Sequence, residues 1–412
     1  IFKYCCFASF SIQPLIILFR KIIFTQVFTK RGIMELIRDK DVIFEDSNLE
    51  NLFKLENFPV FMGCMENLNP QDDLYEDFIL DISKTNGIVQ VRNLIQLEVL
   101  YDTEHSSGTV GKIWHDHHKA FADFMSSSTN PKRVFEIGGL HGILSKYYNQ
   151  NNEISSWTIV EPNPIPVDDC PANFIEGFFG NDFELDEEFD AYVHSHTLEH
   201  IYKPVEFAKK LSEFIPEGKD LFFSIPNIEE MIKRKYTNAI NFEHTFFLTT
   251  ELAIYLMESS GFDLITRKKF MDDHSMFYHF KKTTKKKVDT KIFENKYDYN
   301  KKLFTEWFDH HKKEAENLVK KIHDTNSPVF LFGAHIFSQT LLNFGLDEEH
   351  INCILDNDDK KHNKRLYGTN LIVKSPNILA DHHKPIIILR AGVYNNEIKE
   401  QILNINPSSI II

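Results

Sequence analysis

A short apolar segment that ends in a glycine-rich turn constrains this chain most. Residues 131–137 predict a strand, Gly138, Gly139 and Gly142 follow it, and a helical segment begins at Ile143. Glycines let a ligand approach the backbone closely, and the first turn of a helix offers free N–H groups. The pattern therefore predicts a nucleotide-binding turn at the end of this strand.

Further predicted strands alternate with helical segments. Residues 157–161 form a second apolar run that ends in Glu161, and residues 189–193 and 221–225 form two more. A carboxylate at the position of Glu161 can accept both hydroxyls of a ribose. The alternation favours an α/β fold with a parallel, doubly wound sheet, whose ligands lie at the carboxyl ends of the strands.

The spacing of the glycines separates two kinds of cofactor. Dinucleotide sites follow G-x-G-x-x-G, whereas the glycines here stand at 138, 139 and 142, and Glu136 precedes the first of them by two residues. This spacing favours S-adenosyl-L-methionine over NAD. We expect the cofactor to contact Glu136, the three glycines and Glu161.

Two further residues are expected beside the cofactor. Phe178 lies between the predicted strands at 157–161 and 189–193, at the place where this fold usually stacks a side chain on adenine. His196 follows the strand at 189–193. His196 and His200 share the spacing of one helical face. Together with Glu199, this spacing suggests a metal site. In zinc proteases a glutamate directly follows the first histidine, whereas Glu199 directly precedes the second one. We therefore expect no metal here and a structural role for His200.

From about residue 42 to its C-terminus the chain resembles the sugar C-methyltransferases, which use S-adenosyl-L-methionine to methylate carbon on deoxysugar nucleotides. The resemblance lies in three groups of segments, which are 134–142 with Glu161 and 196–201; 225–228, 241–252 and 259–262; and 328–335, 340–346 and 354–361. It implies a class I methyltransferase (Rossmann-like) central domain, a small N-terminal domain and a second Rossmann-like C-terminal domain.

The resemblance also implies the domain limits. We expect an N-terminal degenerate zinc-type substrate domain at 34–125, a cofactor domain at 126–285 and a substrate-side domain at 286–412. The last begins with an amphipathic helix at 295–323, after a lysine-rich linker at 281–288. Residues 1–33 are expected to be untranslated or disordered because Met34 reads as a start; the alternative is a membrane-associating arm.

Glu243 and His244 are the expected catalytic pair, because the resemblance places them in the keto-sugar site. Carbon methylation needs a proton removed beside a carbonyl, and an imidazole suits that abstraction near neutral pH. The adjacent Glu243 would orient the base or bind the sugar. The family tyrosine two residues before this pair is Asn241 here, and the loop at 102–108 lacks a second tyrosine. The acceptor and the methylated atom therefore stay open.

The zinc-binding thiols of the family are missing. Ser83 and Asn86 stand where one Cys-x-x-Cys pair is expected, residues 44–47 contain no cysteine, and only Cys64 lies nearby. A structural zinc site takes four ligands, so we expect no zinc. His115, His117 and His118 lie in a helix-like stretch and are expected on its polar face.

The composition of the chain narrows the classes of function that it can have. The chain has 46 basic and 60 acidic residues, a net charge of −14, which argues against a nucleic-acid binder. We expect a cytoplasmic monomer or homodimer, without membrane contact, that acts on a nucleotide sugar. The alternatives are an O- or N-methyltransferase, a non-catalytic cofactor-binding partner protein, and an NAD-type reductase. The segment 332–335 with Asp356 resembles part of a second dinucleotide site.

Overall fold

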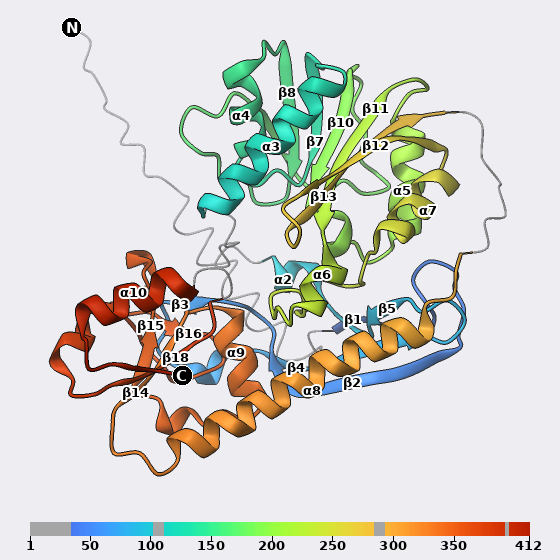
Figure 1. Cartoon of the computed structure of the whole chain (residues 1–412). Helices are drawn as coiled ribbons and strands as arrows, with labels where there is room; N and C mark the ends of the chain where they lie inside the picture. Colours follow the sequence, from blue (N-terminus) through green and yellow to red (C-terminus); the bar gives the residue numbers. More distant parts are fainter. Residues whose placement is uncertain (1–33, 102–110, 284–292, 392–394) are drawn as a thin grey trace, which may run out of the picture.

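The computed structural model describes residues 34–101, 111–283, 293–391 and 395–412 (Figure 1). The expectations for residues 1–33, for the loop at 102–108 and for most of the lysine-rich linker lie outside the described residues. Within them, no helix is both long enough and apolar enough to cross a membrane.

A seven-stranded sheet forms the centre of the molecule, in the order β12-β13-β11-β10-β7-β8-β9. Only β13 runs antiparallel to its neighbours, and the other pairs are parallel. This order, with one reversed strand near an edge, is that of class I methyltransferases, and it confirms the predicted fold class. The strands are β7 Arg133–Ile137, β8 Ser156–Glu161, β9 Asn173–Glu176, β10 Ala191–Ser195, β11 Asp220–Pro226, β12 Phe262–Phe270 and β13 Ser275–Lys282.

Helices cover both faces of this sheet (Figure 1). Helices α3 (Lys112–Ser128) and α4 (Ile143–Asn151) lie on one face, and α5 (Pro204–Phe214) and α7 (Thr250–Ser259) lie on the other. Successive strand residues point to opposite faces, so Val134 packs under α3 and α4 while Phe135 packs under α5 and α7. Such two-sided burial explains why the central strands read as continuous apolar runs. The expected domain boundary at residue 125 falls inside α3.

Short antiparallel strands form the N-terminal region. β2 (Leu49–Pro59), β4 (Tyr75–Ser83) and β5 (Val89–Val91) make a three-stranded sheet, β1 (Met34–Ile37) pairs with β6 (Asn93–Ile95), and α2 (Leu97–Leu100) follows. The core of this region includes Ile232 of α6 (Ile228–Lys233) and Phe247. The N-terminal sheet therefore packs on the segment of the central domain that carries the expected catalytic pair.

Arg38 strengthens that contact. Its guanidinium is buried and donates to the carbonyl oxygens of Thr245 at 2.5 Å and Tyr202 at 2.7 Å. Burial lowers the pKa of Arg38 to about 9. A buried cation held by backbone oxygens leaves little freedom to the chain around residue 245.

The C-terminal region contains a second sheet in the order β17-β15-β14-β18-β19, and all of its strand pairs are parallel. This agrees with the predicted Rossmann-like domain. Helices α9 (Ile336–Asn343) and α10 (Asn395–Ile405) connect its strands, which are β14 Val329–Phe332, β15 Cys353–Leu355, β17 Val373–Lys374, β18 Ile386–Leu389 and β19 Ile410–Ile411.

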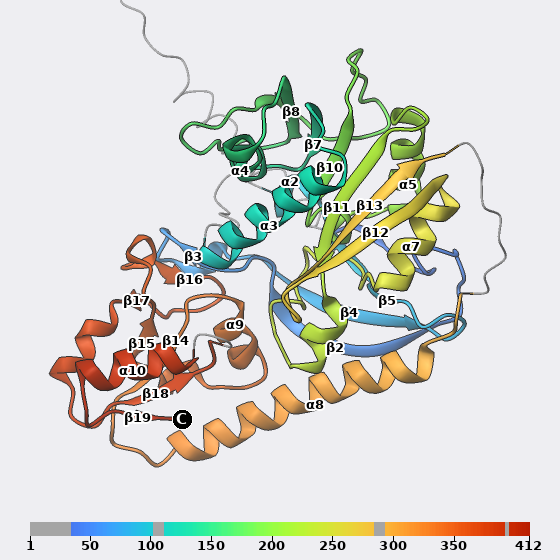
Figure 2. The same cartoon turned by 45° about the horizontal axis from the view of Figure 1, so that its top comes forward.

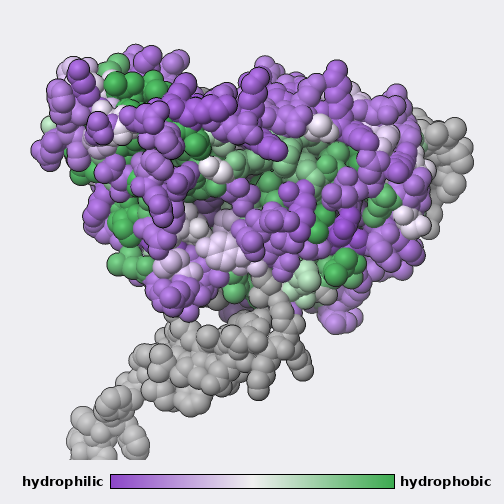
Figure 3. Space-filling view, turned by 90° about the horizontal axis from the view of Figure 1, so that it is seen from below, coloured by the Kyte–Doolittle hydropathy of each residue, from purple (hydrophilic) through white to green (hydrophobic). Residues whose placement is uncertain are grey.

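The long helix α8 (Tyr297–Ile322) joins the regions and matches the helix predicted at 295–323. It runs along β2 towards the C-terminal sheet (Figure 2). Its buried side includes Trp307, which stacks on Phe53 of β2 with ring centres 6.0 Å apart. On the face shown in Figure 3, apolar residues are scattered among hydrophilic ones.

A second contact ties the C-terminal region to the N-terminal one. β16 (Arg365–Leu366) pairs with β3 (Cys64–Met65), and the side chain of Arg365 is buried. Its guanidinium donates to both carboxylate oxygens of Asp73, at 2.5 and 2.7 Å. Two-point charge-assisted hydrogen bonding of this kind fixes orientation as well as distance.

Candidate functional site

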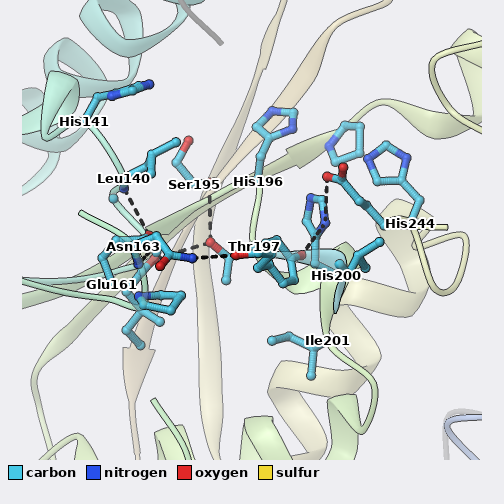
Figure 4. Close-up of a pocket in the computed structure, with 18 of the residues that line it drawn as sticks. Leu140, His141, Glu161, Asn163, Ser195, His196, Thr197, His200, Ile201 and His244 are labelled. Atoms are coloured by element: carbon cyan, nitrogen blue, oxygen red, sulfur yellow. Dashed lines mark hydrogen bonds and ion pairs between the residues drawn. The ribbon is translucent and has the colours of Figure 1, made fainter. Parts of the chain in front are cut away.

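A cavity of about 1260 Å³ lies at the carboxyl ends of β7, β8 and β10. The N-terminal region contributes Tyr101 to its wall, and the C-terminal region contributes His335 and Lys361. Eight of the nine expected site residues line this cavity, namely Glu136, Gly138, Gly139, Glu161, Phe178, His196, Glu243 and His244. Gly142 does not line it, although its neighbours His141 and Ile143 do. Figure 4 shows Glu161 on one side of the pocket and His196, His200 and His244 on the other.

The glycine turn has the backbone that the sequence predicts. Gly138 has φ +76° and Gly142, the residue before α4, has φ +64°. These values lie in the left-handed region that glycine adopts at little cost. A side chain at Gly142 would place its Cβ 2.3 Å from Cys170 Sγ, so this position also lacks room for one.

Glu161 is held at the end of β8 by two backbone groups. Its Oε2 accepts from the N–H of Leu140 at 3.2 Å, and its Oε1 accepts from the N–H of Asn163 at 3.1 Å. Desolvation by burial raises the pKa of Glu161. Each carboxylate oxygen has two lone pairs, so both oxygens keep acceptor capacity for hydroxyl donors in the cavity.

Glu136 lies under the glycine turn. Its Oε2 accepts from Trp157 Nε1 at 2.7 Å, and burial raises the pKa of its carboxyl to about 7. A Cβ at Gly139 would stand 2.7 Å from Glu136 Cδ, so the two residues pack directly on each other. One oxygen of this carboxylate, Oε2, therefore has a structural partner. Contact between Glu136 and a cofactor stays a prediction.

Phe178 differs from its neighbour in packing. Its side chain is 52% exposed and lines the cavity, whereas Phe179 packs into the core under α5 and α7. An aromatic ring with an open face at the cavity wall can stack on a flat heterocycle. This placement is compatible with the predicted position beside adenine.

His196 does not lie on a helix. Its φ is +51°, its N–H donates to the carbonyl oxygen of Ser224, and a 3-10 turn follows at Leu198–His200. The idea of one helical face shared by residues 196 and 200 is therefore wrong. The chain turns sharply at the end of β10. The left-handed backbone conformation of His196 makes this turn, and a helix through residues 196–200 could not.

The side chain of Asn241 caps the backbone of the expected catalytic pair, Glu243 and His244. Asn241 Oδ1 accepts from the N–H of Glu243 at 2.8 Å and from the N–H of His244 at 3.0 Å. Asn241 thus shapes the turn rather than presenting a hydroxyl to the cavity. A tyrosine at this position could not make the same pair of short local hydrogen bonds.

His244 lies with its Nδ1 3.0 Å from the carbonyl oxygen of Ala239. A carbonyl oxygen only accepts, so Nδ1 carries the proton and Nε2 keeps its lone pair. Desolvation by burial lowers the pKa of His244, which keeps the ring neutral at pH 7. Glu243 Oε2 lies 3.9 Å from His200 Nδ1, and burial raises the pKa of Glu243 to about 7.

Two residues that sequence reasoning did not select stand beside this pair. The ring of His200, expected to be structural, is 5.2 Å from the ring of His244, and its Nδ1 is 3.2 Å from the hydroxyl of Tyr101. Both His200 and Tyr101 line the cavity. Both residues are far from His244 in the sequence, so local patterns could not predict the contact. The Leu-Glu-His run at 198–200 was the only sequence feature that pointed to His200.

Three further imidazoles gather on the α3 side of the sheet. His117 is fully buried between Phe270 and Phe277, so its expected place on a polar helix face is wrong. The expectation failed because α3 turns this position towards β12 and β13. Burial lowers the pKa of His196 and of His274 to about 3, so both rings are neutral at pH 7.

The zinc that the resemblance implies for the N-terminal region does not suit the residues found there. Asp41 accepts from the N–H groups of Ile43, Phe44 and Asp46 and from Asn86 Nδ2, all within 3.1 Å. A carboxylate and an amide therefore join the two turns by hydrogen bonds. Structural zinc takes thiolate and imidazole ligands, which this pair does not provide.

Comparison with known proteins adds a family match at one end of the chain. Residues 279–408 match a family model described as "C-methyltransferase C-terminal domain". Together with the strand order of the central sheet, this match decides the class of protein. The chain is a class I methyltransferase. Enzymes of this class take their methyl group from S-adenosyl-L-methionine.

Solved structures of methyltransferases resemble part of this methyltransferase. The N-methyltransferase NodS from Bradyrhizobium japonicum is 13% identical, with 42% of this chain and 99% of that chain covered and a TM-score of 0.31. An S-adenosylmethionine-dependent methyltransferase from Mesorhizobium loti is 10% identical, with 42% and 100% covered and a TM-score of 0.33. Similarity at this level does not extend to substrate or reaction. No curated protein matches the sequence.

Proposed function

We propose that this methyltransferase adds a methyl group to a carbon atom of a nucleotide-linked keto sugar through an enolate. One observation supports it above all others. A single cavity is lined both by the glycine turn with Glu161 and by Glu243 with His244. A methyl donor and a base therefore have access to the same space.

The donor side of the cavity fits S-adenosyl-L-methionine. Glu161 would accept the ribose hydroxyls, the glycine turn would follow the amino-acid part, and Phe178 would lie on the adenine, with His196 at the border of the site. The bound cofactor supplies an electrophilic methyl group on a sulfonium. Glu161 is already held in place by two N–H groups, so it loses little freedom on binding.

The acceptor side provides a proton acceptor. His244 Nε2 would take a proton from the carbon beside the ketone, while Nδ1 keeps its hydrogen bond to Ala239. The resulting enolate is the carbon nucleophile that methylation requires. The hydroxyl of Tyr101 and the neutral ring of His200 stand on the same side and share one hydrogen bond, which leaves one hydrogen of the pair to donate to the enolate oxygen.

Residues of the C-terminal region would meet the nucleotide. Lys361 lines the cavity, and its Nζ is 3.1 Å from Asp356 Oδ2. A partly paired ammonium at a cavity wall can turn to a diphosphate, which carries more charge than a single carboxylate. The domain whose sequence matches a C-methyltransferase family thus supplies part of the expected substrate wall.

Hydrogen exchange at the acceptor carbon tests the enolate. The protein is incubated in deuterium oxide with S-adenosyl-L-homocysteine and each member of a panel of nucleotide keto sugars, and deuterium at the carbon beside the ketone is measured by mass spectrometry. We expect deuterium uptake with at least one sugar. When S-adenosyl-L-methionine replaces S-adenosyl-L-homocysteine, we expect the same sugar to be methylated. Methylation without any exchange would overturn the carbon assignment.

An oxygen or nitrogen acceptor is the second candidate, and Asn241 is the observation that favours it. The residue that the family uses for the keto-sugar site here caps the backbone of Glu243 and His244. His244 could equally remove a proton from a hydroxyl or an amine. Methylation of sugars that lack a ketone would support this candidate, whereas donor binding with no product from any sugar would support a non-catalytic partner protein.

A further inference from the structure

We propose that His117, His196 and His274 form a binding site for one late first-row divalent cation, such as Zn²⁺ or Co²⁺. The three rings come from α3, from the turn after β10 and from the turn between β12 and β13. One ring nitrogen of each lies within 4.8 Å of those of the other two. Residues from three separate elements thus converge on one point.

His117 is the strongest sign of a missing ligand. It is fully buried, and neither Nδ1 nor Nε2 has a hydrogen-bond partner. A buried polar atom without a partner destabilises the fold, so most such atoms in proteins are paired. The ring centre of His117 lies 5.2 Å from that of His196 and 5.4 Å from that of His274. Coordination of an ion between the rings would satisfy one of these two nitrogens.

His196 and His274 already converge on a common atom. Ser275 Oγ lies 2.8 Å from His196 Nε2 and 2.6 Å from His274 Nδ1. The hydroxyl has only one hydrogen, so it cannot donate to both rings at once. An ion between these rings would displace or share this hydroxyl.

Glu199 is placed to become the outer partner that ligating histidines usually have, and neither of its carboxylate oxygens has a hydrogen-bond partner among the described residues. Its Oε1 lies 3.2 Å from His196 Nδ1, and its side chain is 2% exposed. A carboxylate on one ring nitrogen favours the tautomer whose other nitrogen is free to bind a metal. For His196 that free nitrogen is Nε2, the one that faces His274 through Ser275.

The donor set selects the kind of ion. Three neutral imidazoles without thiolate suit zinc, cobalt, nickel or copper and are poor ligands for magnesium or calcium. His196 and His274 line the large cavity, whereas His117 lies behind them. Three protein ligands leave a fourth position on zinc, and here it would open to the cavity, where water or an oxygen of the acceptor could bind.

This site differs from the zinc site that the missing thiolates argue against, and it departs from the expectation that the chain holds no zinc. Two other groups of candidate ligands exist among the described residues, Glu199 with His200 and His244, and His310 with His311 and Glu314. The first includes the proposed base, and the second lies on α8, with His310 exposed and His311 Nε2 bonded to the carbonyl oxygen of Lys235. Neither contains a buried ring with two unpartnered nitrogens.

Titration of the metal-free full-length protein with Co²⁺ tests the site, because cobalt bound by nitrogen ligands in a low-coordinate site absorbs strongly in the visible range. We expect one equivalent to bind. His274→Gln and His117→Gln should each weaken binding by at least about 10-fold, because even the loss of an outer-shell partner costs about 10- to 100-fold in metal affinity. His311→Gln and His244→Gln are matched controls and should keep the affinity of the unchanged protein.

Absence of stoichiometric binding in the unchanged protein overturns the proposal. So does binding that survives His274→Gln, or that is lost in either control, since the ion would then belong elsewhere. His274 is partly exposed, so its variant keeps the test valid if His117→Gln does not fold. Neither methyl donor nor sugar is present in this titration, so its outcome is independent of the proposed function.

Discussion

His244 Nδ1 lies 3.0 Å from the carbonyl oxygen of Ala239, five residues earlier in the chain. This contact places the ring proton on Nδ1 and leaves Nε2 as the basic atom. Burial lowers the pKa of His244, so the ring is neutral throughout the range near pH 7. A base prepared in this way needs no prior deprotonation.

Replacing His244 by Asn tests the base directly. Asn keeps a polar group near Ala239 but cannot take up a proton, so kcat should fall by about 10²- to 10⁴-fold. The dissociation constant of S-adenosyl-L-homocysteine, measured by calorimetry, should stay within about twofold because His244 lies away from Glu161 (Figure 4). Retained full turnover would remove His244 from the reaction.

Glu243 should make stability depend on pH. Its pKa is raised by burial from 4.5 to about 7, so between these values the unfolded chain loses this proton while the folded protein keeps it. This group's contribution to folding therefore becomes less favourable as pH rises from 4.5 to 7. Glu243→Gln should raise the melting temperature at pH 8 and change it little at pH 4.5. An equal shift at both pH values would contradict burial of the carboxyl.

Glu161→Gln should weaken binding of the methyl donor. The amide lacks the charge that strengthens hydrogen bonds from hydroxyls, a loss of about 1.5–3 kcal/mol, or roughly 10- to 100-fold in affinity. The thermal shift produced by S-adenosyl-L-homocysteine measures it. Glu153→Gln, at an exposed position beyond α4, is the matched control. If both variants bind equally well, Glu161 does not hold the cofactor.

The glycine turn offers a test of backbone geometry. Gly142→Ala would put a Cβ 2.3 Å from Cys170 Sγ at a φ of +64°, and it should lower the free energy of unfolding by about 1–3 kcal/mol or more. Gly180→Ala, where nothing lies within 4 Å of the new Cβ, should have little effect. Urea denaturation measures both. Partial rescue of Gly142→Ala by Cys170→Ala would separate the clash from the strain.

Asn86→Ala should open the two turns of the N-terminal region. It removes the amide that donates to Asp41 Oδ2 at 3.1 Å and leaves a buried carboxylate oxygen with one partner fewer. We expect a loss of about 1–3 kcal/mol in urea denaturation. Asp39→Ala, at an exposed position two residues before Asp41, serves as the control. Equal stability of the two variants would show that this hydrogen bond does not hold the two turns together.

Local patterns in the sequence determined the central strands, the glycine turn, the acid at Glu161 and the helix at 295–323. These features could be predicted because each depends on residues close in the chain, such as an apolar run of strand length or a glycine with a left-handed φ. The Rossmann-like character of both sheets follows from the same alternation of strands and helices. The pair Glu243–His244 was found by resemblance alone.

Only the tertiary structure decided which distant side chains meet. It buried His117 beside His196 and His274, brought Tyr101 to His200, and joined Asp41 to Asn86. A sequence records the periodicity along one element, but the direction in which a polar side chain points depends on the elements packed against it. Desolvation acts through that packing, and it is what makes a histidine a base, a ligand or a core residue.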